Sequence, residues 1–69
     1  MSRAVLQVLR ASNEPLCARE VTAGLADQFP DVPEVVLRTR VNTFLSTKAK
    51  VGVLAAFKRP GDLTRYRVA

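Results

Sequence analysis

The sequence has no histidine or tryptophan and only one cysteine, Cys17. Without histidine, the chain cannot build a His-based catalytic triad, a His-containing zinc site or the usual proton shuttle at neutral pH. A single cysteine excludes an internal disulfide, and we expect it to be a small buried side chain. The six Asp and Glu residues are scattered and lack the spacing of an acid/base pair. The sequence therefore predicts a protein that is not an enzyme and needs no metal or cofactor.

Long apolar runs are also missing. None approaches the roughly 20 residues that cross a bilayer, and no signal-peptide pattern opens the chain. We therefore expect no membrane association and a cytoplasmic protein, located at the nucleoid if it binds DNA. A chain of 69 residues fits one domain, residues 1–69, with one small core, because a chain of this size buries only about 60% of its unfolded surface.

Positive charge is unevenly distributed along the chain. Residues 1–34 contain three Arg against five acids, whereas residues 35–69 contain eight Lys or Arg against Asp62 alone. The second half therefore carries all of the net positive charge. Cationic surfaces of this kind commonly bind polyanions.

The stretch from Asp31 to Lys50 has the pattern of one amphipathic helix. At 3.6 residues per turn, a narrow stripe is apolar and must face a core: Leu37, Val41, Phe44 and Leu45. The opposite side is polar, with Thr39, Asn42, Thr43, Ser46 and Lys50, and the cations Arg38 and Arg40 lie at its two borders. We predict a helix over residues 32–50 that offers this polar side to a partner. An ordinary solvated face is the alternative interpretation.

The ends of this helix carry their own signals. Asp31 followed by Glu34 resembles a capping box, and Pro33 suits a first helical turn. Gly52 suits the position that follows a helix C-terminus. Lys48 lies near the apolar stripe, so we expect its stem to run along the core.

Two further helices are predicted upstream. The first, over residues 3–11, has an apolar side made of Val5, Leu6 and Leu9. The second, over residues 18–29, has apolar residues at a spacing of four, namely Val21, Leu25 and Phe29. Pro15 between them limits residues 14–17 to an extended link or a short edge strand. Gly24 costs about 1 kcal/mol relative to alanine inside a helix, and a close approach by another helix would explain it.

Residues 53–68 have the pattern of a β-hairpin. An apolar run over residues 53–57 is followed by a basic turn, in which Pro60 and Gly61 occupy the second and third positions of a type II bend. The last strand alternates, with Tyr66 on the apolar face and the cations Arg65 and Arg67 on the other. The fold class predicted is therefore α+β, with three helices and a small antiparallel hairpin.

This order of elements resembles a winged helix-turn-helix DNA-binding domain over nearly the whole chain. The resemblance depends on the opening AVLQVLRASNEPLCAREVTAGL and on the ending RYRV after a basic turn. These segments also resemble the HARE-type subset of winged helices. The family often has Ser or Thr at the cap of the second helix, where this chain has Cys17.

The resemblance implies binding of double-stranded DNA, with the third helix in the major groove and the wing on the backbone or in the minor groove. The residue types agree, because Arg pairs with guanine or phosphate, Asn reads adenine, and Ser or Thr contacts either base or backbone. We expect the cations of the helix and hairpin to converge on one side. The predicted DNA-binding residues are Arg38, Thr39, Arg40, Asn42, Thr43, Ser46, Lys50, Lys58, Arg59, Arg65 and Arg67.

Within DNA binding, a small transcription regulator and a chromosome-organising protein both fit. A different class of function is a protein-interaction module that docks a transcription, replication or phage-target protein, since fold does not fix function. RNA binding is a third interpretation. The chain offers few aromatic platforms for single strands, with three Phe and one Tyr.

Overall fold

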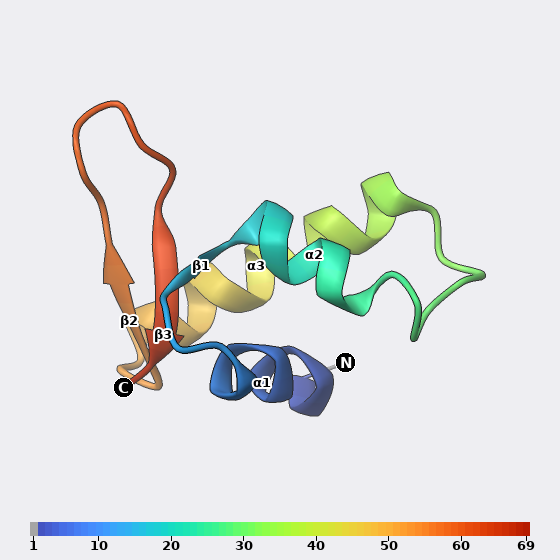
Figure 1. Ribbon diagram of the computed structural model, residues 1–69, viewed down its shortest axis with the longest axis horizontal. Coiled ribbons are helices and arrows are strands. Elements are labelled where there is room, and N and C mark those ends of the chain that lie inside the picture. Colours follow the sequence, from blue (N-terminus) through green and yellow to red (C-terminus); the bar gives the residue numbers. More distant parts are fainter. Residues whose placement is uncertain (1) are drawn as a thin grey trace.

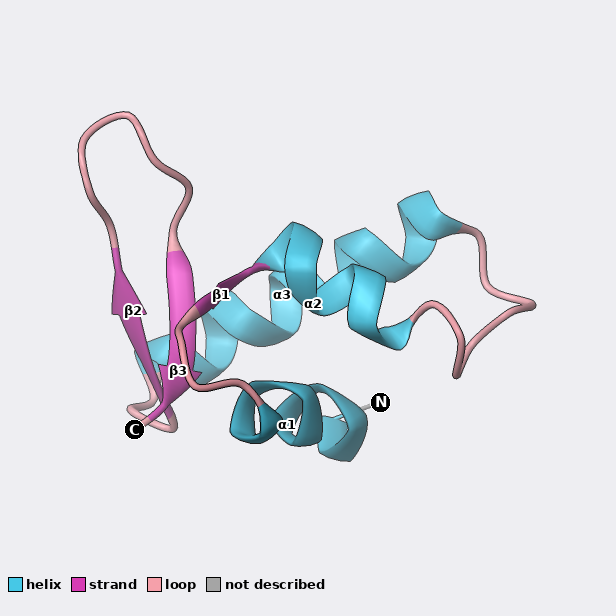
Figure 2. Cartoon of the chain, in the orientation of Figure 1, coloured by secondary structure: helices cyan, strands magenta, loops and turns pink. Residues whose placement is uncertain are grey.

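Three helices and a three-stranded antiparallel sheet form this α+β protein, which is described by a computed structural model over residues 2–69 (Figure 1). The elements are α1 (Ser2–Ala11), β1 (Leu16–Cys17), α2 (Ala18–Leu25), α3 (Glu34–Lys50), β2 (Leu54–Phe57) and β3 (Arg65–Val68). The predicted α+β class and the predicted order of elements are confirmed. Figure 2 shows the two longest loops, between α2 and α3 and between β2 and β3.

The sheet has the strand order β1-β3-β2. β3 pairs antiparallel with both neighbours, so that Leu16 lies opposite Tyr66 and Leu54 lies opposite Val68. β1 is therefore a short edge strand, as Pro15 indicated. Tyr66 and Val68 pack against the hydrophobic core, so the sheet covers one end of the helices with its apolar face.

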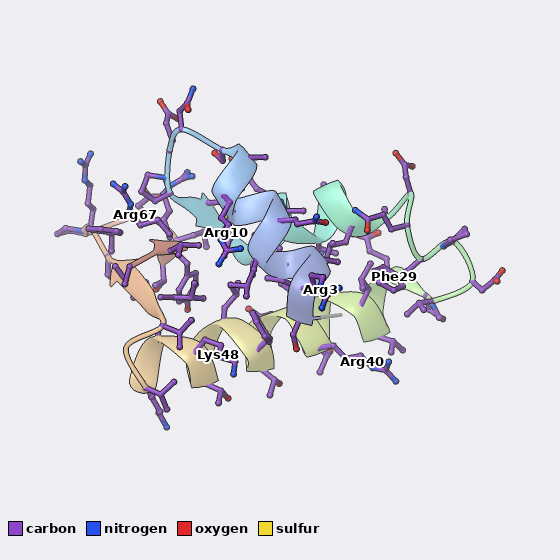
Figure 3. The ribbon with its side chains drawn as sticks, turned by 90° about the horizontal axis from the view of Figure 1, so that it is seen from below. Arg3, Arg10, Phe29, Arg40, Lys48 and Arg67 are labelled. Carbon is purple, nitrogen blue, oxygen red and sulfur yellow. The ribbon has the colours of Figure 1, made fainter. Side chains whose placement is uncertain are left out.

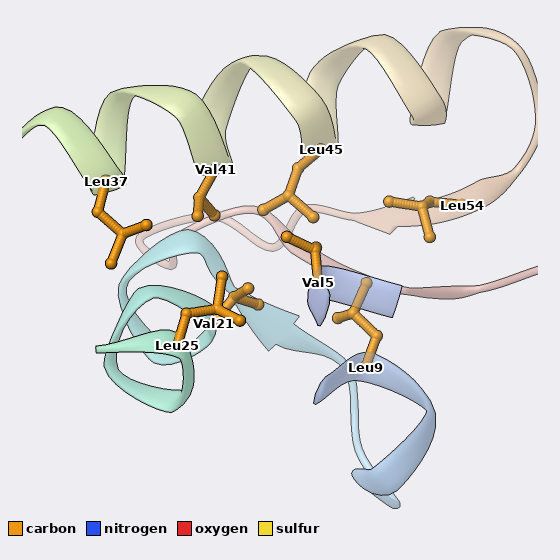
Figure 4. Close-up of a cluster of buried hydrophobic side chains, with 8 residues drawn as sticks. All are labelled: Val5, Leu9, Val21, Leu25, Leu37, Val41, Leu45 and Leu54. Carbon is orange, nitrogen blue, oxygen red and sulfur yellow. The ribbon is translucent and has the colours of Figure 1, made fainter. Parts of the chain in front are cut away.

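The core lies between α3 on one side and α1 with α2 on the other (Figure 4). α3 contributes the predicted residues Leu37, Val41 and Leu45, all at most 2% exposed. The opposing helices and β2 contribute the other buried members of the cluster: Val5, Leu9, Val21, Leu25 and Leu54. Phe44, which the sequence placed in the same stripe, is half-buried at its border. The predicted stripe of α3 is therefore confirmed.

Gly24 marks a close contact between α1 and α2. A Cβ atom built at this position would lie 3.2 Å from Cγ1 of Val8. That distance is shorter than the usual separation of two carbon atoms in contact. The close helix approach predicted from Gly24 is therefore confirmed, and its partner is α1.

Two glycines adopt the left-handed backbone conformation that other residues avoid. Gly52 has φ +84° and follows Val51, the C-cap of α3, where the sequence predicted a C-terminal glycine. Gly61 has φ +79°, and the N–H of Asp62 donates to the carbonyl oxygen of Arg59 at 3.0 Å. These are the features of the predicted type II turn.

The segment between α2 and α3 differs from the prediction. α2 ends at Leu25, whose carbonyl oxygen accepts hydrogen bonds from the N–H groups of Gln28 (2.9 Å) and Phe29 (3.2 Å). The predicted extension to residue 29 is therefore wrong. The spacing was misleading because Phe29 packs against the core from a turn rather than from a helix.

The predicted start of α3 is also wrong. The helix begins at Glu34, its N-cap is Pro33, and no side chain caps it. Pro33 enters with φ −57° and ψ 142°, and its carbonyl oxygen accepts from the N–H of Leu37 at 3.0 Å. The carboxylate of Glu34 accepts from Nη2 of Arg38 one turn later instead of closing a box with Asp31.

Candidate nucleic-acid interface

The outward side of α3 is polar from Arg38 to Lys50, whereas its first turn exposes Val35 and Val36. All seven side chains that the sequence assigned to this side are exposed: Arg38, Thr39, Arg40, Asn42, Thr43, Ser46 and Lys50. The helix has 17 residues and is therefore about 26 Å long. Its inward side is fixed by the core, so the polar side cannot rotate away from solvent.

A cleft of about 310 Å³ lies beside this helix, between α3, the start of α2 and the β2–β3 hairpin. Two of its lining residues, Arg38 and Asn42, come from α3, and Lys58 comes from the hairpin just after β2. Thr64 and Tyr66 form the hairpin wall. The cleft thus brings together a cation of the helix and a cation of the hairpin, as the sequence predicted for these two elements.

Arg19 is a cleft residue that sequence reasoning missed. It is the second residue of α2, it is exposed, and it lines the same cleft as Arg38 and Lys58. A cation in the first turn of a helix opposes the helix dipole. This unfavourable position could have indicated a functional role for Arg19. The charge count did not reveal it, because Arg19 lies in the half of the chain that is acidic overall.

Arg38 also contacts an acid of its own helix. Its Nη2 lies 3.3 Å from Oε1 of Glu34, and the two side chains are 49% and 73% exposed. An exposed pair of this spacing contributes only about 0.3–0.5 kcal/mol. Glu34 therefore holds Arg38 only weakly.

Arg40 lies on the opposite border of α3 from Arg38. It lines a shallow cleft of about 520 Å³ with Ser2 at the start of α1 and with Lys48. Nζ of Lys48 lies 5.7 Å from the ring centre of Phe44, so its stem runs along the core border as predicted.

We name the outward polar side of α3 together with Arg19 and Lys58 the front face.

The remaining hairpin cations do not join the front face. Leu54, Tyr66 and Val68 face the core, so alternation turns Arg65 and Arg67 to the other side of the sheet. Arg59, Arg65 and Arg67 border a separate cleft on that side, together with Phe57. The expectation that all helix and hairpin cations converge on one side is therefore wrong. The physical reason is that α3 packs against the apolar face of the sheet, which the alternating arginines cannot share.

Arg65 is held by two carboxylates. Its Nη1 donates to Oε1 of Glu20 at 2.7 Å, and its Nε donates to Oδ2 of Asp62 at 3.3 Å. Glu20 lies in the first turn of α2, whereas Asp62 lies in the hairpin loop. Arg65 therefore ties the hairpin to the start of α2, and its charge is neutralised within the protein.

The same cluster lowers the pKa of both acids. The pKa of Glu20 falls below its ordinary value mainly because the backbone N–H of Cys17 donates to it at 3.0 Å, and Arg65 adds to the effect. The pKa of Asp62 is lowered mainly by the backbone N–H of Leu63, which donates at 2.7 Å, and then by Arg65. Both carboxylates are therefore held in the charged form.

Within residues 2–69, no three His, Cys, Asp or Glu side chains come together where they could hold a metal ion. Over the same residues, no helix is both long enough and apolar enough to cross a membrane. Comparisons with protein-family models, curated proteins and solved structures found no match for this chain.

Proposed function

We propose that this chain is a winged-helix domain that binds double-stranded DNA and catalyses no reaction. α3 acts as the recognition helix, and the β2–β3 hairpin acts as the wing. The observation that carries this proposal is the cleft that joins Arg19, Arg38 and Lys58 beside the exposed polar side of α3. Three cations from three elements border one hollow, and none of the acids lines it.

The chemistry of the front face fits a duplex. A major groove about 12 Å wide admits one helix, and the short polar side chains of α3 allow a close approach to base edges. Asn42 and Arg38, one turn apart on the cleft side of α3, are the types that read adenine and guanine. Arg19 and Lys58 flank them and are placed to neutralise phosphates, which take half or more of the contacts in such complexes.

Protein docking, the other class of function considered, lacks a specific supporting observation. The exposed large apolar side chains lie in three separate regions: Val35 and Val36 in the first turn of α3, Val51 and Val53 after α3, and Phe57 and Leu63 in the hairpin. Figure 1 shows the start of α3 at one end of the molecule and the β2–β3 hairpin at the other. A docking site would gather them into one patch.

Salt dependence of duplex binding tests the proposal. If about five cations of the front face each neutralise one phosphate, the logarithmic salt slope is about −4.5, and doubling the salt weakens binding about twentyfold. Fluorescence anisotropy of a labelled duplex across a salt series measures this slope. The charge-matched variants R19Q/R38Q/K58Q and R3Q/R10Q/R67Q separate the front face from general cationic attraction.

The first variant should reduce the slope by about 2.7 and the second should change it little. Equal effects of the two variants would attribute binding to net charge alone. Absence of duplex binding by the unmodified protein at low salt would overturn the proposal.

A further inference from the structure

Three arginines lie outside the front face, on α1 and on the outer side of the sheet. Arg3 and Arg10 are exposed on α1, and Arg67 is exposed on β3. Figure 3 views the molecule from the α1 side and shows Arg3 and Arg10 along the helix, with Arg67 beyond its C-terminal end. We name these three side chains the rear face.

The core fixes the direction of this face. Val5 and Leu9 of α1 point into the core from the side opposite α3 (Figure 4). Arg3 and Arg10 lie across α1 from these two residues at 3.6 residues per turn, so they point away from α3. Arg67 lies on the outer side of the sheet, because its neighbours Tyr66 and Val68 take the core side.

Arg10 and Arg67 meet at one hollow although they come from opposite ends of the sequence. Both border a cleft of about 220 Å³ between the end of α1 and β3. Ser12, Asn13 and Glu14 complete its polar rim. Glu14 is the one acid of this cleft, and its carboxylate forms no ion pair with any residue of 2–69.

The rear arginines form no ion pair within the described residues, although Arg67 borders the cleft that Glu14, Glu20 and Asp62 also line. Within residues 2–69, none of the three lies within 4.0 Å of a carboxylate. α1 itself contains no Asp or Glu. Arg65, in contrast, stands on the same side of the sheet and is neutralised by two acids. Arg3, Arg10 and Arg67 therefore have no ion-pair partner within residues 2–69, whereas Arg65 has two.

We infer that the rear face binds a second DNA duplex, so that one molecule bridges two duplexes. This inference depends on the proposed function, because the front face holds the first duplex. Arg3 and Arg10 are two helical turns apart, about 10 Å along the axis, and Arg67 extends the row past the end of α1. A row of separated cations suits a repeating polyanion such as a phosphate backbone.

An acidic protein segment is the weaker fit for this face. Protein interfaces are stabilised mainly by large anchor side chains in buried pockets. None of the exposed large apolar side chains lies on α1, where Gln7 and Ala11 are the exposed neighbours of the arginines. Phe57 is exposed and borders a cleft with Arg67, but no such side chain lies on α1 beside Arg3 and Arg10, which favours the nucleic acid backbone there.

A capture experiment tests the inference. An unlabelled duplex is immobilised, the protein is added at low salt, and capture of a fluorescent duplex from solution is measured. The unmodified protein should capture it. R3Q/R10Q/R67Q should lose capture at least about tenfold, while its affinity for a single duplex stays within about threefold of the unmodified protein. Far-UV circular dichroism confirms that the variant is folded.

Two further variants sharpen the result. R19Q/R38Q/K58Q removes the same number of charges from the front face and should weaken binding of the first duplex instead. Glu14→Gln removes the acid of the rear cleft and should increase capture of the second duplex. Sedimentation measured at the capture concentration should show a monomer, since two-face binding needs one molecule only.

The possible failures are distinguishable. If the unmodified protein binds no duplex at all, the proposed function fails and this inference fails with it. If it binds one duplex but captures no second, only the inference is overturned. Capture by a dimer that persists in R3Q/R10Q/R67Q would also overturn it, because each subunit would then hold one duplex through its front face.

Discussion

At the scale of single residues, Glu20 joins parts of the chain that are distant in sequence. Its Oε1 accepts from the backbone N–H of Cys17 and from the guanidinium of Arg65, which lies 45 residues away. The same arginine contacts Asp62 in the hairpin loop. One carboxylate thereby stabilises the start of α2 and fixes the hairpin beside it.

Acid should weaken this cluster. The lowered pKa of Glu20 means that its contribution to the free energy of unfolding is complete above the pKa of the unfolded chain, and is lost as the pH falls through the folded pKa. Glu20→Gln removes this titration. The stability difference between the unmodified protein and the variant should therefore shrink as the pH is lowered from about 6 to about 3.

Urea unfolding at a series of pH values measures this difference. Asp27→Asn is a suitable control, because Asp27 is exposed and makes no ion pair within the described residues. A difference for Glu20→Gln that stays constant across the acid range would contradict the assigned role.

The residue types predicted the α3 side chains of the front face but not Arg19. The exposed side chains of α3 follow from the position of Leu37, Val41 and Leu45, since a helix buried on one side exposes the other. Arg19 could not be placed by charge counting, because its partners Arg38 and Lys58 come close only through the packing of α2 against α3 and the sheet.

At the scale of elements, the contact between α1 and α2 depends on the missing side chain of Gly24. An alanine there gains about 1 kcal/mol of helix propensity. It also places a Cβ atom 3.2 Å from Cγ1 of Val8, which must then move. The two effects oppose each other in the native protein.

Gly24→Ala should therefore change stability little or reduce it. In a Val8→Ala background the obstructing methyl groups are absent, so the same substitution should stabilise by up to about 1 kcal/mol. A double-mutant cycle measured by urea unfolding gives the coupling between the two positions. Equal effects of Gly24→Ala in both backgrounds would show that the close contact does not control stability.

The boundaries of elements were predicted correctly where the backbone preference of a single residue determines them. Gly52 and Gly61 adopt the left-handed conformation that only glycine enters without strain, so the end of α3 and the hairpin turn followed from sequence. The segment from residue 26 to residue 33 did not follow the apolar spacing. Phe29 reaches the core from a turn there, and Asp31 caps nothing, because tertiary packing decided these positions instead of propensity.

At the scale of the whole molecule, charge alone did not predict where the cations lie. The net positive charge of the sequence lies in residues 35–69. In the structure, however, Arg19 lies on the front face and Arg67 lies outside it. Strand alternation and the side on which α3 packs decide this division. The resulting molecule has two separate groups of exposed cations around one small core.

Amide chemical shifts of the ¹⁵N-labelled protein test most directly whether the front face holds the duplex. During titration with a short duplex below one equivalent, we predict that the first amides to shift lie in residues 38–50 of α3, at residues 17–19 and around Lys58. Shifts that begin at α1, or that spread evenly over the surface, would contradict binding of the duplex by the front face.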